Sequence, residues 1–412
     1  MMTSVVIKEI VVEDKRFPLD SGAGSDAVHT IPQYSYAVCY LKTDSPLTGV
    51  GIAFTLGSGN DLVCKAIEYL SESLVGKEIN ELMANFGTVF SQLSDSPTFR
   101  WLGPHKGIIH LALASITNAC FDLWAKTKKV PLWKLLVDLS PEEVVNLLDF
   151  RYVEDLLTKE EALEILHQGQ VTKSEREKIL STGYTGYDTS VGWFNYPDDV
   201  VVENAKQAVA KGFKAMKLKV GSKDFSRDIN RAFLIRETVG DDITIMLDAN
   251  QQWTLHQSIE IIRQLKDMNP YWVEEPTDPD DVLAHQTLAR AVSPVKIALG
   301  EHVPNKIMFK NFLQANAMSF NQVDTVRVGG ISEFILISLM SKKCNVPVIP
   351  HVGDMGQIHQ HLVLFNHISI GLPDLFLEYI PHLRKYFKFP VTISDGRYKV
   401  PENYGSSCDF VE

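Results

Sequence analysis

Acidic side chains stand at the ends of consecutive apolar runs in the middle of the chain. They are Asp248, Glu274 and Glu301. Carboxylates that meet without a partner repel one another, so either they hold protons or a cation lies among them. Oxygen ligands at a cleft that admits water and substrate suit Mg²⁺. Each acid taken singly could be an exposed strand end, but three in succession predict a Mg²⁺ site.

Basic side chains flank these acids. Lys217 and Lys219 lie in the run 215–220 and would share one face of a strand, because alternate strand residues point the same way. Two lysines that face an apolar interior are costly unless they meet charge. Proximity to each other and to a metal would lower a lysine pKa and make it a usable base near neutral pH. Asp324 and His351 end two later runs, and the carboxylate could orient the imidazole as a base. An unrelated surface pair is the alternative.

These residues can meet only if they lie on strands whose carboxyl ends converge. Each apolar run has the length and β-branched content of a strand, and a helical pattern follows each before the next begins. A strand about every 25 to 30 residues is the period of a (β/α)8 barrel, in which strand-end residues from distant parts of the sequence meet at one mouth. The predicted strands are residues 184–191, 215–220, 243–248, 271–274, 296–301, 322–324, 346–351 and 375–380.

The composition indicates a cytoplasmic protein with sizeable cores. The chain has 412 residues, 45% of them hydrophobic, which is enough for a barrel and a second domain. Its net charge of −11 argues against nucleic acid and anionic membrane surfaces as partners. We expect no secretory leader and no membrane-spanning apolar run. The scattered cysteines are expected to be reduced thiols: Cys39, Cys64, Cys120, Cys344 and Cys408.

Several motifs together resemble the enolase superfamily, in its mandelate racemase-like branch. They are Lys217-x-Lys219, Asp248-Ala249-Asn250, Val273-Glu274-Glu275-Pro276, Gly300-Glu301, Asp324 and Pro350-His351. Within this branch the chain is most similar to the L-fuconate dehydratase group and its L-galactonate dehydratase relatives. This closer similarity spans nearly the whole chain, at residues 16–18, 34–35, 54–57, 100–104, 122–126, 149–152 and 377–379.

The resemblance implies an α/β fold, a (β/α)8-type barrel with an N-terminal α+β capping domain. Strand-like patterns at 5–12 and 36–41 and helical patterns at 61–74 and 106–127 fit such a cap. The loop 20–26 is rich in glycine, serine and aspartate and has few apolar anchors. We therefore expect it to be mobile, and the resemblance implies that it closes over the barrel mouth and excludes water. Glycines that merely make turns are the alternative.

A charged helical segment separates the cap from the barrel. Ser140 and Thr158 each precede a glutamate at the third position, which is typical of helix starts. In the resembled group this segment is an insertion. The predicted domains are 1–139 for the α+β cap, 140–182 for the helical insertion, 183–381 for the barrel and 382–412 for a C-terminal segment that packs back on the cap.

The arrangement predicts chemistry at the carbon next to a carboxylate. Lys219 and His351 would face opposite sides of a substrate, so that one removes the C2 proton and a general acid helps the 3-hydroxyl leave. Mg²⁺ would act as Lewis acid and template, and Lys217 would place charge at the developing enediolate oxygen. Glu378, if protonated, could hydrogen-bond the carboxylate end. Together with the resemblance, the arrangement predicts Mg²⁺-dependent dehydration of a six-carbon aldonate to a 2-keto-3-deoxy acid. The resemblance implies L-fuconate as the expected substrate.

Substrate contacts are predicted at Asn250 and Trp101, although Trp101 could instead be a core residue. After His351 the chain departs from the resembled group at Asp354 and Met355, which we expect to alter which distal hydroxyls fit. The expected partner is a small acid sugar, and a homo-oligomer is expected. The alternatives are racemisation or epimerisation of a 2-hydroxy acid by the same two bases, and a barrel that binds acid sugars without turning them over.

Overall fold

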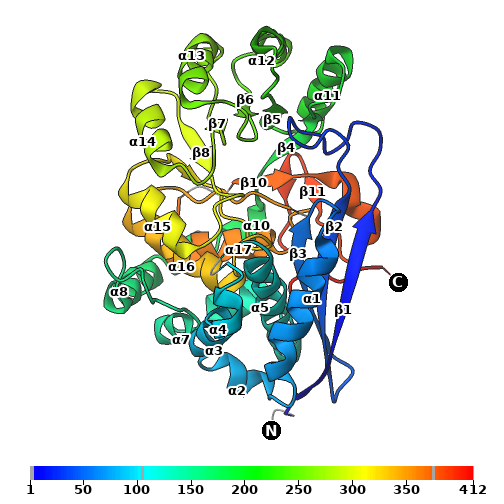
Figure 1. Cartoon of the computed structure of the whole chain (residues 1–412), viewed down its shortest axis with the longest axis vertical. Helices are drawn as coiled ribbons and strands as arrows, with labels where there is room; N and C mark the ends of the chain where they lie inside the picture. The colour runs from blue at the N-terminus through cyan, green and yellow to red at the C-terminus, as the bar shows by residue number, and fades with distance from the viewer. Residues whose placement is uncertain (1–3, 104–105, 354, 374–375, 412) are drawn as a thin grey trace.

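The computed structural model describes residues 4–103, 106–353, 355–373 and 376–411. It confirms a (β/α)8 barrel preceded by a mixed α/β capping domain (Figure 1). We propose that the boundaries between cap, helical insertion, barrel and C-terminal segment lie at residues 139/140, 182/183 and 381/382.

The capping domain is a three-stranded antiparallel sheet covered by helices. The sheet runs β1 (Ile7–Phe17), β2 (Tyr34–Thr43) and β3 (Thr48–Thr55). Helix α5 (Gly107–Lys128) lies close against it because Gly51 of β3 has no side chain. A Cβ there would lie 2.0 Å from the carbonyl oxygen of Ser115. The other helices are α1 (Asn60–Ser71), η1 (Glu72–Leu74), α2 (Ile79–Met83), α3 (Phe86–Ser94), α4 (Pro97–Arg100) and α6 (Leu132–Asp138).

Helix α5 is long and apolar enough to cross a membrane by length and composition, which the sequence prediction did not anticipate. Of the most apolar 18-residue stretch of this helix, 89% is buried inside the protein. Core helices of soluble proteins meet the same criterion, so this helix is weak evidence for a membrane span.

The segment between cap and barrel is helical, as its charge pattern predicts. Ser140 and Thr158 both form capping boxes, with Glu143 and Glu161 as their reciprocal partners. Its helices are α7 (Pro141–Asn146), α8 (Lys159–Val171), α9 (Lys173–Arg176) and α10 (Ile179–Thr182).

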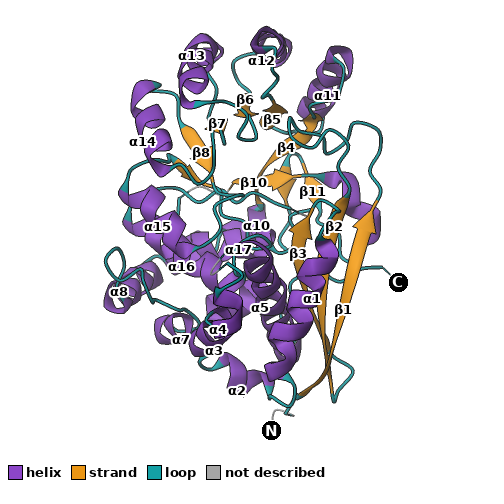
Figure 2. Ribbon diagram, viewed as in Figure 1, coloured by secondary structure: helices purple, strands orange, loops and turns teal. Residues whose placement is uncertain are grey.

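Parallel strands form the barrel wall, with helices outside it (Figure 2). The strands are β4 (Tyr184–Gly192), β5 (Ala215–Lys219), β6 (Thr244–Asp248), β7 (Val273–Glu274), β8 (Ile297–Leu299), β9 (Phe320–Asn321) and β10 (Phe376–Tyr379), with β10 pairing β4. The outer helices are α11 (Asp198–Ala210), α12 (Phe225–Val239), α13 (Leu255–Leu265), η2 (Lys266–Met268), α14 (Val282–Ala291), α15 (Lys306–Gln314), α16 (Ile331–Lys343), α17 (His359–Phe365) and the π-helix η3 (Asn366–Ile370).

Two predicted strands differ from the structure. Strand β9 ends at Asn321, so Asp324 follows the strand instead of closing it. The run 346–351 contributes one parallel bridge, between Val348 and Asn321. Because Pro347 and Pro350 have no N–H to donate, this run cannot form a regular ladder.

The barrel interior is filled by side chains. Tyr187, Ala215, Met246, Trp272, Ala298, Phe320 and Ile349 form a separate buried cluster there. This packing makes a solid floor, and polar strand-end residues stand above it at the carboxyl ends.

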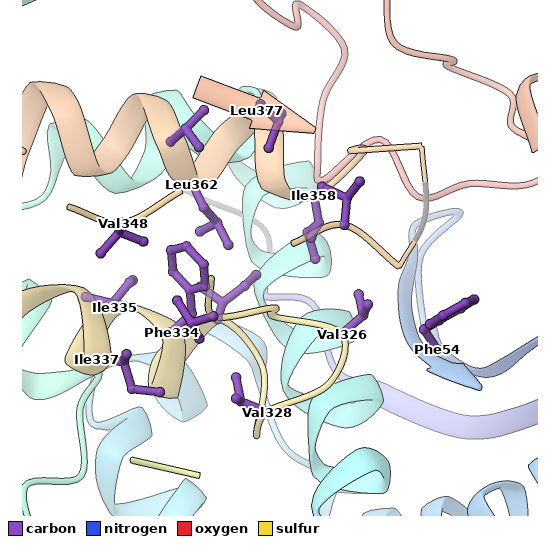
Figure 3. Packing of buried hydrophobic residues seen from close by; sticks show 14 of the residues in the cluster. Phe54, Val326, Val328, Phe334, Ile335, Ile337, Val348, Ile358, Leu362 and Leu377 are labelled. Carbon is purple, nitrogen blue, oxygen red and sulfur yellow. The ribbon is translucent and has the colours of Figure 1, made fainter. Parts of the chain in front are cut away.

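Cap and barrel are joined by buried hydrogen bonds. The N–H of Phe54 in β3 donates to Val326 O at 3.0 Å, and Asn118 Nδ2 of α5 donates to Thr325 O at 3.1 Å. Figure 3 shows Phe54 and Val326 among the labelled buried side chains of this region. These contacts place the cap sheet beside the loop that carries Asp324.

The end of the chain contacts both parts. The helix η4 (Pro381–Tyr386) is followed by a hairpin, β11 (Ile393–Ser394) and β12 (Arg397–Tyr398), that pairs with β4 of the barrel. Beyond it, Asp409 accepts from Lys126 of α5 at 2.9 Å, and Phe410 stacks on Phe17 of β1. In Figure 1 the C-terminus accordingly lies beside β1.

Candidate functional site

The predicted acids meet at the barrel mouth. Asp248 ends β6, Glu274 ends β7 opposite it in register, and Glu301 follows β8. They are 0%, 1% and 8% exposed, and one oxygen of each lies within 4.8 Å of the others. Buried carboxylates this close need positive charge among them. An all-oxygen set of this kind fits Mg²⁺.

Both predicted lysines point into this acidic cluster. Lys217 Nζ lies 2.8 Å from Glu274 Oε1 and 2.7 Å from Glu378 Oε1. Lys219 Nζ lies 2.5 Å from Asp248 Oδ2. Burial acts to lower the pKa of each lysine, but the neighbouring carboxylates outweigh it and raise both pKa values. The expectation of a lowered lysine pKa is therefore wrong for the protein chain by itself, because acids and not cations surround the amines.

The pKa values of Glu274 and Glu301 shift in opposite directions. Burial raises the pKa of Glu274 to about 8, against the opposing effect of Lys217. The indole N–H of Trp272, two residues earlier in the chain, donates to Glu274 Oε2 at 3.0 Å. Burial also acts to raise the pKa of Glu301, but the charge of His351 and hydrogen bonds from His302 and His351 hold it well below its usual range.

Asp324 and His351 form the predicted pair. His351 Nδ1 lies 2.7 Å from Asp324 Oδ2, and His351 Nε2 lies 2.7 Å from Glu301 Oε2. The alternative of an unrelated surface pair is wrong, since the Asp324 side chain is fully buried. With Nδ1 held by Asp324, Nε2 is the nitrogen that faces the acidic cluster.

Glu378 also reaches the cluster, from β10. Its Oε1 contacts Lys217 and accepts from Thr189 Oγ1 at 2.5 Å, and its Oε2 accepts from the Val352 N–H at 3.2 Å. Burial acts to raise the pKa of Glu378, yet Lys217 and His351 outweigh it and lower this pKa. The structure therefore favours the ionised form of Glu378, whose carboxylate accepts hydrogen bonds and balances the charge of Lys217.

Residues of both the barrel and the cap line a cavity above the cluster. Lys219, Asn250, Glu301, His351 and Glu378 line it from the barrel. The remaining lining residues are Gly24, Asp26, His29, Tyr34, Phe54 and Leu56 of the cap, and Trp193, His302, Arg327 and Ile380 of the barrel side.

The cap loop is anchored by polar contacts, which the sequence pattern did not reveal. The Ser25 hydroxyl accepts from the Asn195 N–H at 3.0 Å, and Ser25 O accepts from the Phe194 N–H at 3.0 Å. Asp26 accepts from the His29 N–H at 2.6 Å. These bonds hold the loop against the segment after β4 and bring Asp26 and His29 to the cavity.

Asn250 and Trp101 have different positions. Asn250 lines the cavity, is 3% exposed, and its buried Oδ1 has no hydrogen-bond partner among the described residues. Trp101 follows the short helix α4, and it is 94% exposed and absent from the described cavity lining. The structure thus places Trp101 neither at the cavity nor in a core, because none of the elements that the structure describes packs over the turn after α4 that carries it.

Of the two residues after His351 expected to affect substrate fit, only Met355 can be placed. Met355 is fully buried and does not line the cavity. Asp354 lies outside the described residues.

Sequence reasoning missed a second polar group at the mouth. Glu275, Glu301 and His302 could also hold a metal by distance, and His302 Nδ1 lies 3.0 Å from Glu275 Oε1. Burial raises the pKa of Glu275 to about 7. Burial acts to lower the pKa of His302, but Glu275 and Glu301 outweigh it and raise the pKa to about 10. A charged imidazole among these acids makes this group an ion-pair network, so the all-carboxylate set is the better Mg²⁺ site. The sequence signal for the two missed residues was adjacency: Glu275 directly follows Glu274, and His302 directly follows Glu301.

Family models match both parts of the chain. Residues 8–137 match the mandelate racemase / muconate lactonizing enzyme N-terminal domain, and residues 200–412 match the enolase C-terminal domain-like family.

Individual proteins match over nearly the full length. The mitochondrial enolase superfamily member 1 of Homo sapiens is 42% identical over 416 residues, covering 98% of this chain and 94% of its own. The L-galactonate dehydratase of Hypocrea jecorina is 38% identical over 419 residues, covering 99% and 93%. The crystal structure of the human protein superposes with a TM-score of 0.96 at 41% identity, covering 100% of this chain and 95% of that one.

A more distant structure shares the fold. The L-talarate/galactarate dehydratase of Salmonella typhimurium LT2, solved with Mg and L-lyxarohydroxamate, has a TM-score of 0.79 at 24% identity, and the match covers 100% of this chain and 92% of that one. At this identity the likeness concerns the fold alone.

Proposed function

Because the chain belongs to the enolase superfamily, we propose that it is a Mg²⁺-dependent hydro-lyase that dehydrates a six-carbon aldonate to a 2-keto-3-deoxy acid. The observation that carries the proposal is the buried set Asp248, Glu274 and Glu301 with Lys219 at one member and His351 at another. The name of the L-galactonate dehydratase relative supports the same class of substrate.

The residues divide the work between binding and proton transfer. Asp248, Glu274 and Glu301 would hold Mg²⁺, which supplies Lewis-acid stabilisation of charge that develops on the substrate carboxylate. Lys217, buried beside Glu274, adds a fixed positive charge on the same side. This charge is in place before the reaction, so it needs no reorganisation when the carboxylate end gains electron density.

Proton transfer falls to Lys219 and His351. Lys219 pairs with Asp248, and His351 pairs with Glu301. The two bases therefore lie beside different carboxylates of the cluster and can approach a substrate from different positions. One group takes the proton from C2, and the C3–O bond then breaks as a general acid protonates the departing hydroxyl. The enol left behind takes up a proton at C3 to give the 2-keto-3-deoxy acid. One water is lost in total.

We propose L-fuconate as the substrate among the aldonates. Its terminal carbon is a methyl group, and the cavity wall has apolar members in Phe54, Leu56 and Ile380. L-galactonate differs by one hydroxyl at that carbon. Because apolar pockets reject an added hydroxyl only by about 100-fold, we expect L-galactonate to be a slower substrate, not an inert one.

An acid-sugar screen with Mg²⁺ tests the proposal. Each aldonate and aldarate is incubated with the protein, and the product is measured as a 2-keto acid and by mass. A mass lower by one water identifies dehydration, whereas an unchanged mass with inverted C2 identifies the racemase or epimerase that the same two bases would allow. If no acid sugar yields a 2-keto acid, the proposed activity is wrong; if L-galactonate exceeds L-fuconate in kcat/KM, only the choice of substrate is wrong.

The proposal also covers the localisation, the partners and the assembly of the protein. We propose that the protein works in the cytoplasm on a small acid sugar, without nucleic acid or membrane partners, and as a homo-oligomer. The net charge of −11 supports the proposal that nucleic acid and anionic membranes are not partners.

A further inference from the structure

Asp324 is shared between two histidines. Its Oδ2 lies 2.7 Å from His351 Nδ1, and its Oδ1 lies 2.8 Å from His359 Nε2. His351 lines the cavity, whereas His359 does not and is fully buried behind Asp324. The proposed reaction uses His351 and gives His359 no part, so the second imidazole needs its own explanation.

The contacts of Asp324 determine which way the protons point. A carboxylate only accepts, so at 2.8 Å the His359 Nε2 must carry the hydrogen. The Thr325 N–H also lies 3.2 Å from this nitrogen, but a protonated nitrogen cannot accept, and the shorter contact to a charged oxygen prevails. Oδ1 also accepts from the Val326 N–H at 2.9 Å. Two donors therefore occupy Oδ1, and Oδ2 is left for His351.

The His359 ring is itself held in place. It is the first residue of α17, and its ring meets the Phe334 ring of α16 edge-on, with centroids 6.5 Å apart at 67°. Its neighbours Ile358 and Leu362 lie with Phe334 in one cluster of buried side chains (Figure 3). A ring packed in this way keeps one orientation, so its N–H is a fixed reference for the carboxylate.

We propose that His359 is a positioning residue that acts on His351 through Asp324. By donating to Oδ1 it fixes the plane of the carboxylate, so that Oδ2 receives the Nδ1–H of His351 and Nε2 of His351 stays directed at the substrate. The consequence for turnover rests on the proposed function, but the hydrogen bond between Asp324 and His351 does not.

Two substitutions separate the hydrogen bond from the volume of the ring. His359→Leu removes the donor, and His359→Gln restores a side-chain N–H near the position of Nε2. Since groups that orient a reactive side chain contribute about 10- to 100-fold, we expect His359→Leu to lower kcat for aldonate dehydration by that factor with KM little changed. His359→Gln is expected to recover most of kcat.

The chain offers a matched control two residues away. His361 is also fully buried on α17, but its contacts are the Trp133 N–H at 3.2 Å and the Ser407 hydroxyl at 3.3 Å. His361→Leu therefore makes the same change in the same helix without touching Asp324. It is expected to leave kcat unchanged.

A measurement without substrate tests the geometry directly. In Mg²⁺-loaded, histidine-labelled protein, the Nδ1–H of His351 is expected to give a downfield proton resonance, assigned by its absence in His351→Asn. His359→Leu should broaden or shift this resonance upfield, whereas His359→Gln and His361→Leu should keep it. Should His359→Leu not fold, His359→Asn, whose amide is too short to reach Oδ1, takes its place.

The outcomes are decisive in combination. An unchanged resonance in His359→Leu overturns the proposal, whatever happens to kcat, as does a kcat no lower than that of His361→Leu. If the wild-type protein dehydrates no aldonate, the proposed function fails, and the resonance alone still decides whether His359 positions His351.

Discussion

Lys217 Nζ lies 2.8 Å from Glu274 Oε1 in a pair that is withdrawn from solvent, with side-chain exposures of 0% and 1%. The same amine lies 2.7 Å from Glu378. One cation therefore balances two buried carboxylates from strands on different sides of the barrel mouth. The electrostatics of the site depend on this shared cation.

Removing that cation should destabilise the protein. In Lys217→Met two buried carboxylates lose their partner, and breaking a buried pair costs about 3 to 5 kcal/mol. Urea unfolding without Mg²⁺ measures the loss. Lys65→Met is the control: Lys65 pairs with Glu68 at 2.7 Å on the surface, with side-chain exposures of 75% and 48%, so removing this solvent-screened pair should change stability far less. Equal losses in the two variants would contradict buried pairing at Lys217.

The two bases should be separable by isotope exchange. Lys219→Met and His351→Asn are each expected to lower dehydration by about 100- to 10,000-fold, the usual contribution of a positioned acid or base. Only the variant that lacks the proton-abstracting group should also lose exchange of the C2 proton in D₂O. The exposed Lys65→Met and His167→Asn serve as controls. If both active-site variants exchange C2 as fast as wild type, neither group abstracts the proton.

Mg²⁺ should stabilise the folded protein through the carboxylate cluster. At a free concentration of 100 times Kd, a ligand bound only by the folded state adds about 2.7 kcal/mol. Melting with and without Mg²⁺ is expected to show this gain in wild type and a smaller one in Asp248→Asn, Glu274→Gln and Glu301→Gln. EDTA should abolish activity. The exposed Glu142→Gln should respond as wild type does, and equal gains in all variants would place the metal elsewhere.

His361 should make the fold sensitive to acid. Burial lowers the pKa of His361 to about 3, while in the unfolded chain it is about 6.5. Between these values only the unfolded chain binds the proton, so stability is intact above about pH 6.5 and falls as the pH drops.

His361→Leu should remove this dependence. Between pH 7 and 5 the wild type should lose about 2 kcal/mol through this residue, and the variant should not. Urea unfolding at the two pH values measures the difference, with the exposed His167→Leu as control. A wild-type slope that survives in His361→Leu would assign the acid sensitivity to other groups, such as His382, whose pKa burial lowers to about 4.

Much of the barrel could be predicted from the sequence. Strand-end acids at Asp248, Glu274 and Glu301 recur with the barrel period, and because parallel strands in a barrel share one mouth, their meeting follows from the period. Lys217 and Lys219 face the same interior because side chains alternate along a strand. The cap helices and the starts at Ser140 and Thr158 follow from local patterns that act within one turn.

Other features depend on contacts between distant residues. The pKa of Lys219 is raised where a lowered value was expected, and the pKa of Glu378 is lowered, because each side chain meets charged partners from other strands. The exposure of Trp101 and the anchoring of the loop by Ser25 are likewise decided by what packs nearby, which no local pattern contains.

By itself, then, the sequence determined the type of barrel and placed the predicted acids and lysines at its mouth, because strand period and side-chain alternation can be read from residues close together in the chain. Only the tertiary structure decided which atoms pair, which groups carry protons and how His359 comes to share Asp324 with His351. Charge interactions in a buried site depend on distances of a few ångströms between elements far apart in the chain, and these distances exist only after folding.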